Sequence, residues 1–158
     1  MGKVSSEYFK KSKMKIGIYP GSFNPYHVGH HNIYLKARQL FDKVYLAKGI
    51  NPEKEISEFI IPNNIPSIEY DKSLIDGIKH VLQLNSKSDV DVFIVRGFRN
   101  IKDVEYQQTQ DYWLKQNYIY FKSIYIECEE QYKQVSSSAI NELKRLNLSY
   151  KHLLPKNL

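Results

Sequence analysis

The sequence predicts an α/β fold: a doubly wound, five-stranded parallel sheet with helices between the strands. Two observations predict this class. Short runs rich in Val, Ile, Tyr or Phe have the composition of buried strands. Longer segments with apolar residues three or four positions apart lie between these runs, and strands that alternate with helices indicate a parallel sheet. Ligands bind beyond the carboxyl ends of the strands in such sheets, so residues that follow a strand are candidates for a site.

Each element is bounded by its own pattern. The predicted strands are Met14–Tyr19, Lys43–Lys48, Ser67–Tyr70, Val90–Val95 and Ser123–Glu127. The predicted helices are His30–Phe41, Ser73–Leu84, Asp103–Tyr118 and Ser138–Leu146. The third helix is the most polar, and we interpret its apolar positions as Val104, Tyr106, Trp113 and Leu114. The segment Asn51–Pro66 contains three prolines and is expected to be a long loop, which in a compact domain is functional or mobile.

Length and composition indicate one domain. The chain has 158 residues, of which 42% are hydrophobic and 25% charged. We expect residues 1–13 to form a flexible basic arm or leader and residues 14–158 to form the domain. No apolar run approaches the roughly 18 residues that span a bilayer, and no secretory signal is evident. Cys128 is the one cysteine, which excludes an internal disulfide and favours a reducing, cytoplasmic compartment.

The net charge of +6 and the pI of about 9.2 favour anionic partners, either small polyphosphates or nucleic acid. RNA-binding modules interleave basic and aromatic residues, and we see no such stripe here, so no nucleic acid is expected as a partner. Solubility, together with a mobile N-terminal tail, is the simpler explanation of the excess charge.

The segment Tyr19–His30 joins the first predicted strand to the first predicted helix and reads Tyr-Pro-Gly-Ser-Phe-Asn-Pro-Tyr-His-Val-Gly-His. A strand, a glycine-containing loop and a helix start in that order can bind phosphate. The Ser22 hydroxyl and the His30 ring N–H could donate to it. A turn with surface histidines is the alternative. A zinc site of His27, His30 and His31 lacks the accompanying ligands at an accepted spacing.

Two later segments also suit anions. Arg96 and Arg99 flank a glycine at a strand end, and guanidinium groups bind phosphate bidentately. They could instead pair with Asp103 and Glu105 at the surface. Three serines, Ser136–Ser138, precede a helix, where they supply an N-cap or, alternatively, hydroxyls and amides for phosphate.

The order of these motifs resembles that of the phosphopantetheine adenylyltransferase family of nucleotidylyltransferases. The matching segments are Pro20–Pro25, Gly29-His30, Phe41–Val44, Asn51–Lys54, Arg96–Arg99, Asp103–Tyr106, Ser136–Ser138 and His152–Pro155. The resemblance covers residues 14–158. It implies a Rossmann-like nucleotidylyltransferase domain and a homohexamer.

The resemblance also implies a reaction, the transfer of AMP from ATP to 4′-phosphopantetheine that gives dephospho-coenzyme A and pyrophosphate. Mg²⁺ would accompany ATP, with no metal held by the protein. The implied catalytic residues are Ser22, His30, Lys54 and Arg99. The implied ATP-binding residues are Ser22, Phe23, His30, Gly97, Arg99, Glu105, Gln107, Ser136, Ser137 and Ser138. The implied acceptor-binding residues are Ser22, Lys54 and Arg96.

Several positions depart from the family's pattern. Asn24 replaces the usual Asp, His27 replaces a frequent Thr, and Gln107 replaces a frequent Glu. Trp113-Leu114-Lys115 stands where Met-Asn-Arg is common, on the helix that the resemblance places along the pantetheine channel. These changes leave two alternatives open: a transferase that uses CTP or another phosphorylated acceptor such as nicotinamide mononucleotide, and a non-catalytic nucleotide-binding module.

Overall fold

The computed structural model describes residues 13–50, 61–117 and 121–156, and it contains a single five-stranded sheet. The strands are β1 (Met14–Gly21), β2 (Lys43–Gly49), β3 (Ser67–Tyr70), β4 (Val90–Phe98) and β5 (Lys122–Glu127). They lie in the order β3-β2-β1-β4-β5, and every neighbouring pair is parallel. The predicted α/β class with a five-stranded parallel sheet is confirmed.

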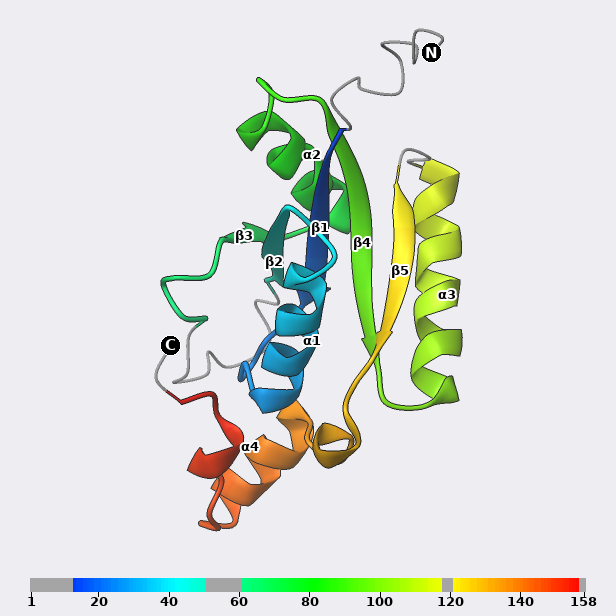
Figure 1. Ribbon diagram of the computed structural model, residues 1–158. Coiled ribbons are helices and arrows are strands. Elements are labelled where there is room, and N and C mark those ends of the chain that lie inside the picture. The colour runs from blue at the N-terminus through cyan, green and yellow to red at the C-terminus, as the bar shows by residue number, and fades with distance from the viewer. Residues whose placement is uncertain (1–12, 51–60, 118–120, 157–158) are drawn as a thin grey trace, which may run out of the picture.

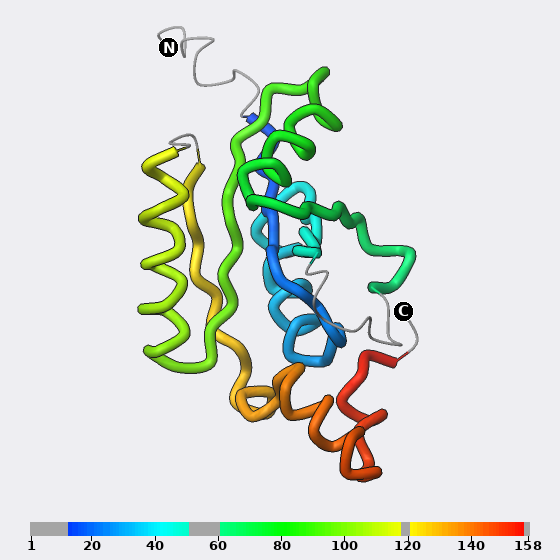
Figure 2. The backbone as a smooth tube through the Cα atoms, turned by 180° about the vertical axis from the view of Figure 1, so that it is seen from behind, coloured from blue at the N-terminus to red at the C-terminus, as the bar shows by residue number. Residues whose placement is uncertain are grey.

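Helices cover both faces of the sheet. The α-helices are α1 (Val28–Arg38), α2 (Leu74–Leu84), α3 (Ile101–Asn117) and α4 (Ser137–Arg145), and two 3₁₀ turns follow β5 and α4, η2 (Glu130–Tyr132) and η3 (Lys151–Leu153). Helix α1 covers one face and α2 the other, α3 stands beside β5, and α4 lies beyond the carboxyl ends of the strands (Figures 1 and 2). Within the described residues no helix is long and apolar enough to cross a membrane.

The core consists of two apolar clusters, one on each face of the sheet. On the first face Ile33 and Ala37 of α1 pack against Val95 of β4. On the second face Ile78 of α2 packs against Ile94. Alternate residues of β4 thus enter opposite clusters, as the two-residue period of a strand requires. Strands β1 and β4 lie inside the sheet and are buried on both faces, so their carboxyl ends form a rigid base for a site.

The structure corrects several boundaries. Helix α1 begins at Val28 instead of the predicted His30 because His27 caps it, and it ends at Arg38 instead of Phe41. Strand β4 continues through Phe98, three residues beyond the predicted end, because it stays paired with β5 as far as Glu127. Of the predicted loop 51–66, residues 61–66 contain no helix or strand, and the remainder lies outside the described residues.

The predicted apolar face of α3 is wrong at two of its four positions, Tyr106 and Trp113, and is confirmed at Leu114. Tyr106 and Trp113 are 68% and 63% exposed, and Asp111, only 4% exposed, is buried instead. The side of α3 that meets the sheet carries polar residues four positions apart, followed by Leu114, which packs against the second core cluster. Helical periodicity located the helix correctly, but the contact between α3 and the sheet is made largely by polar side chains where apolar ones were expected.

Candidate functional site

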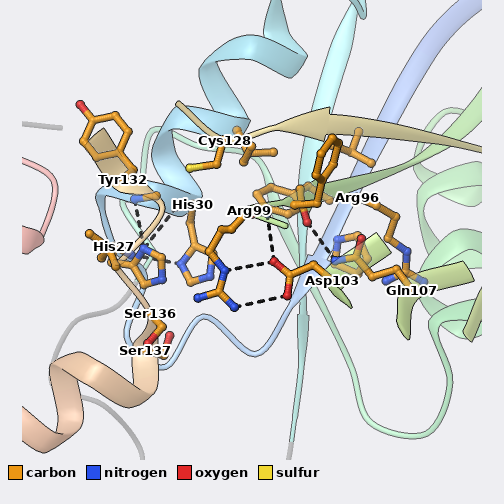
Figure 3. Close-up of a pocket in the computed structure, with 18 residues that line it drawn as sticks. His27, His30, Arg96, Arg99, Asp103, Gln107, Cys128, Tyr132, Ser136 and Ser137 are labelled. Carbon is orange, nitrogen blue, oxygen red and sulfur yellow. Dashed lines mark hydrogen bonds and ion pairs between the residues drawn. The ribbon is translucent and has the colours of Figure 1, made fainter. Parts of the chain in front are cut away.

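A cavity of about 290 Å³ lies at the carboxyl ends of β1 and β4. Its wall combines the end of β1, the start of α1, the end of β4, the start of α3 and the start of α4 (Figure 3). The polar and titratable residues of the wall are Tyr19, His27, His30, Arg96, Arg99, Asp103, Gln107, Cys128, Tyr132, Ser136 and Ser137. The starts of three helices and two arginines therefore face one space, which is suited to an anion.

Two histidines cap helix α1. The Nδ1 atom of His27 accepts the backbone N–H groups of Gly29 (3.1 Å) and His30 (3.3 Å). In return, Nδ1 of His30 accepts the backbone N–H of His27 at 3.2 Å. This reciprocal arrangement is a capping box, with histidines in place of the usual hydroxyl and carboxylate. Because Nδ1 is an acceptor in both rings, the proton of each neutral imidazole is on Nε2.

Burial keeps both imidazoles neutral. Desolvation lowers the pKa of His30 well below its usual value, and the neighbouring His27 and Arg99 lower it further. Desolvation likewise lowers the pKa of His27 to about 4. The His30 ring stacks on His27 with centroids 3.7 Å apart, and Phe23 meets it edge-on at 4.9 Å. His30 is thus a neutral Nε2–H donor held rigidly in the cavity wall.

Arg99 is held at the cavity by Asp103. Its Nε donates to Asp103 Oδ2 at 3.1 Å, and its backbone N–H donates to the same oxygen at 2.9 Å. Desolvation opposes ionisation of Asp103, but the bonds from Arg99 outweigh it and lower the carboxyl pKa. The Arg99 side chain remains 37% exposed, so donors of its guanidinium are open to a ligand. The sequence offered pairing of the arginines with Asp103 as an alternative to anion binding. Arg99 does pair with Asp103, and it also lines the cavity.

Arg96 has a different carboxylate partner. Its Nη2 and Nε donate to Oδ1 of Asp111 at 2.8 and 3.2 Å. Oδ2 of Asp111 accepts the hydroxyl of Tyr125 at 2.9 Å. The Arg96 and Asp111 side chains are 10% and 5% exposed, so this ion pair is buried. Arg96 pairs with neither Asp103 nor Glu105.

The serines at α4 have structural partners. Ser136 is the N-cap, and its Oγ accepts the backbone N–H of Ala139 at 3.0 Å. The hydroxyl of Ser137 donates to the carbonyl of Pro25 at 2.9 Å, which joins α4 to the first loop. The capping prediction is confirmed. Both serines also line the cavity, where the first-turn amides of α4 that Ser136 does not cap can bind an anion.

Seven of the predicted site residues meet in the cavity wall: His30, Arg96, Gly97, Arg99, Gln107, Ser136 and Ser137. Four other predicted residues within the described ranges lie outside that wall. Ser22, Glu105 and Ser138 are exposed, and Phe23 is buried beneath His30, where it orients the ring. Lys54 lies outside the described residues.

Sequence reasoning missed several members of the wall. Cys128 and Tyr132 follow β5 and look like ordinary loop residues, and no local pattern marks them. The sequence does not indicate that His27 caps a helix, because histidine is not a preferred N-cap residue. Asp111 stands eight positions after Asp103, and its spacing on the helix is the one signal that could have indicated a second arginine partner.

The described residues contain no cluster of candidate metal ligands. No group of three or more His, Cys, Asp or Glu residues lies together in the ranges 13–50, 61–117 and 121–156. Asp103, the carboxylate of the cavity wall, already binds Arg99. The arrangement can hold a polyphosphate through neutral donors, guanidinium groups and helix N-termini, and it can stabilise charge that develops on a phosphoryl group.

Comparison with known proteins agrees with this chemistry. A family model described as cytidylyltransferase-like matches residues 18–143. The chain is 30% identical over 151 residues to the phosphopantetheine adenylyltransferases of two Streptococcus pneumoniae strains, Taiwan19F-14 and Hungary19A-6. Those alignments cover 91% of this chain and 92% of each relative.

Two solved structures share the fold. One is a putative nicotinate-nucleotide adenylyltransferase from Vibrio parahaemolyticus (TM-score 0.60, 16% identity, 90% of this chain and 88% of that chain). The other is a bifunctional NMN adenylyltransferase/ADP ribose pyrophosphatase from Francisella tularensis, complexed with AMP and a manganese ion (TM-score 0.61, 13% identity, 91% and 45%). Because the family model spans most of the chain and the relatives align along nearly all of it, the chain belongs to the cytidylyltransferase-like family and is a nucleotidyltransferase of the phosphopantetheine adenylyltransferase type.

Proposed function

We propose that this chain transfers AMP from ATP to 4′-phosphopantetheine, a step of coenzyme A biosynthesis. An oxygen of the acceptor phosphate forms a bond to the α-phosphorus of ATP. The bond from that phosphorus to the bridging oxygen of the β-phosphate breaks, and pyrophosphate leaves with the electron pair. The products are dephospho-coenzyme A and pyrophosphate. The names of the Streptococcus pneumoniae relatives support this acceptor.

The observation that carries the proposal is the protonation and fixed position of His30, a neutral imidazole whose proton is on Nε2. A neutral Nε2–H donor can bind a phosphoryl oxygen whether or not that oxygen gains charge, and the bond strengthens as charge develops in the transition state. The ring is fixed by its bond from the His27 backbone, by stacking on the His27 ring and by the edge-on contact with Phe23, so little reorganisation accompanies the reaction. We assign His30 to an oxygen of the α-phosphate.

The two arginines and α4 are the proposed binding groups for the other phosphates, which are the β- and γ-phosphates of ATP and the phosphate of the acceptor. Arg99, partly exposed at the start of α3, and the first turn of α4 would hold the β- and γ-phosphates. Arg96, deeper in the wall, would receive the acceptor phosphate. Ser22 and Lys54 remain proposed partners of the reacting phosphates by their place in the motifs.

Gln107 supports a nucleotide that carries an exocyclic amino group. Its Nε2 donates to the carbonyl of Gly97 at 2.9 Å, which fixes the orientation of the amide. Its Oε1 is buried and, within the described residues, has no hydrogen-bond partner. A buried acceptor without a donor costs free energy, which an N–H group of the ligand would recover. Adenine and cytosine present such a group, whereas the corresponding edges of guanine and uracil present a carbonyl oxygen.

Mg²⁺ is proposed to arrive bound to the phosphates of ATP, where it would screen their charge. The described residues offer no cluster of ligands that would hold it independently, so no step is assigned to the metal. A homohexameric assembly, implied by the resemblance, belongs to the same proposal, and light scattering of the purified protein tests it.

The test is a pyrophosphate-release assay with Mg²⁺, ATP and 4′-phosphopantetheine. We expect release that depends on all three, and we expect mass spectrometry to show dephospho-coenzyme A. The proposal is wrong if no pyrophosphate appears while a known enzyme of the family turns over in the same buffer.

A second candidate acceptor is a nicotinate or nicotinamide mononucleotide. The two solved structures that share the fold favour it, since their names specify such acceptors, and their likeness here extends to the fold alone. Running the same assay with each mononucleotide, and with CTP in place of ATP, separates the candidates by relative kcat/KM.

A further inference from the structure

Helix α3 meets the sheet through a row of polar side chains. Asp103, Gln107 and Asp111 stand four positions apart on the helix. Gln107 and Asp111 contact Gly97 and Arg96 at the end of β4, and Asp103 contacts Arg99, which follows that strand. Of the helix's described residues, Asp111 is the buried one. A carboxylate is an unfavourable group to bury, and a helix that needed only to adhere to the sheet would bury a leucine at this position.

Both oxygens of the Asp111 carboxylate are used. Oδ1 accepts from Nη2 and Nε of Arg96, and Oδ2 accepts from the hydroxyl of Tyr125. Arg96 and Tyr125 are paired neighbours in the β4–β5 register, so their side chains leave the same face of the sheet. Burial and the bond to Asp111 raise the pKa of Tyr125 to about 12, so the phenol stays protonated and remains a donor. One helix and two strands thus fix a single guanidinium.

Arg96 itself belongs to the cavity wall, whereas Asp111 and Tyr125 lie behind it. A guanidinium has five N–H donors in a rigid plane, and the bonds to Asp111 use two of them. The plane and direction of the other donors are therefore set before a ligand arrives. Arg99 differs, because its carboxylate partner Asp103 also lines the cavity and both side chains are partly exposed.

We propose that Asp111, supported by Tyr125, is a positioning residue that presents Arg96 to the phosphate of the acceptor. The inference rests on the proposed function, in which Arg96 binds that phosphate. A replacement of Asp111 should weaken acceptor binding and leave ATP binding unchanged, because the ATP phosphates are assigned to His30, Arg99 and α4. A residue that only stabilised the fold would affect both substrates or neither.

The experiment measures KM for each substrate in turn with the other saturating. Asp111→Asn keeps the shape of the side chain and removes its charge. We expect the acceptor KM to rise about tenfold or more, the loss typical of a bond between charged groups, and the ATP KM to stay within about twofold. Asp91→Asn, which breaks the ion pair of Asp91 with Lys122 at the opposite end of β4 and β5, is the matched control, and neither KM should change.

Tyr125→Phe removes one hydrogen bond and is the variant to use if Asp111→Asn fails to fold. It should raise the acceptor KM about threefold to tenfold. Arg96→Ala supplies the last control. If Asp111 acts through Arg96, the double variant Arg96→Ala/Asp111→Asn should match Arg96→Ala in acceptor KM within about twofold.

The outcomes separate the two proposals. Wild-type protein that is inactive with 4′-phosphopantetheine but active with a mononucleotide refutes that acceptor, and the same KM comparison is then made with the mononucleotide. If the wild type is active and the acceptor KM of Asp111→Asn and Tyr125→Phe equals that of the wild type, the role of Asp111 is overturned. An ATP KM that rises as much as the acceptor KM overturns it too. Inactivity with every acceptor overturns both.

Discussion

His30 is the residue on which the proposed chemistry depends. Its place at a helix start was predictable from the sequence, because Pro20, Gly21 and Pro25 mark the loop before it. Its protonation state was not predictable. The acceptor role of Nδ1 follows from the backbone N–H of His27, and the low pKa follows from burial among Tyr26, Phe23 and His27. Both depend on how the loop folds.

Replacement of this ring tests its role directly. His30→Ala should lower kcat by about 10²–10³-fold, the usual cost of removing one donor to a developing charge. The matched control is His80→Ala on the exposed surface of α2, which should leave kcat unchanged. Steady-state pyrophosphate release checks both. Unchanged kcat in the His30 variant would show that the measured activity does not use this cavity.

At the scale of the element, helix α1 depends on an imidazole cap that titrates. The pKa of His27 is lowered from 6.5 to about 4, so the unfolded chain binds a proton more readily than the folded one between these values. The contribution of His27 to the free energy of unfolding is therefore fully present above about pH 6.5. It is lost as pH falls toward 4, at up to about 1.4 kcal/mol per pH unit. His30 acts in the same direction.

Urea denaturation at pH 7.5, 6 and 5 measures this acid sensitivity. His27→Asn keeps an N-cap acceptor and removes one titrating group, so its free energy of unfolding should depend less on pH than that of the wild type. His80→Asn on the exposed surface of α2 should retain the wild-type slope. Equal slopes in His27→Asn and wild type would show that the cap does not sense pH.

The contact between α1 and β4 leaves no room at Gly97. A Cβ there would lie 2.8 Å from Cγ1 of Ile33, which is buried and cannot move aside. Gly97→Ala should destabilise the fold by about 1–3 kcal/mol and reduce activity, because the same helix carries His30. Gly77→Ala within α2, where the nearest atom is 3.4 Å away, should be neutral or stabilising by up to about 1 kcal/mol. Thermal unfolding and turnover check the pair.

Periodicity predicted the elements more reliably than their faces. Strands and helices were placed within a few residues because buried strands and amphipathic helices repeat locally. Helix α3 is the exception that explains the limit. Tyr106 and Trp113 were assigned to its apolar face, yet the helix turns Asp111 inward to meet Arg96. The face that α3 buries is set by Arg96, which lies fifteen positions before Asp111, and no local sequence pattern indicates that contact.

At the scale of the whole molecule, the cavity is assembled from both ends of the fold. Ser137 of α4 bonds to Pro25 of the first loop, and Asn141 bonds to Asn24 beside it. Any ligand that spans the two helix starts should therefore stabilise the entire domain.

Mg·ATP at about a hundred times its Kd should add about 2.7 kcal/mol to the free energy of unfolding and raise Tm by several degrees. Arg99→Ala should reduce that shift, because it removes a phosphate contact. Arg38→Ala, at the exposed C-terminal end of α1, should retain it. Differential scanning fluorimetry with and without nucleotide gives the comparison. Equal shifts in wild type and Arg99→Ala would place ATP elsewhere.

Local composition and spacing were enough to predict the fold class, the order of the elements and the motifs at strand ends. Which of those residues share a cavity depends on long-range contacts, which only the three-dimensional structure shows. The fold brought His30, Arg96 and Arg99 together and left Ser22, Glu105 and Ser138 exposed outside the wall. It also gave each arginine its own carboxylate, since strand register and helix rotation are set by contacts between residues distant in the chain.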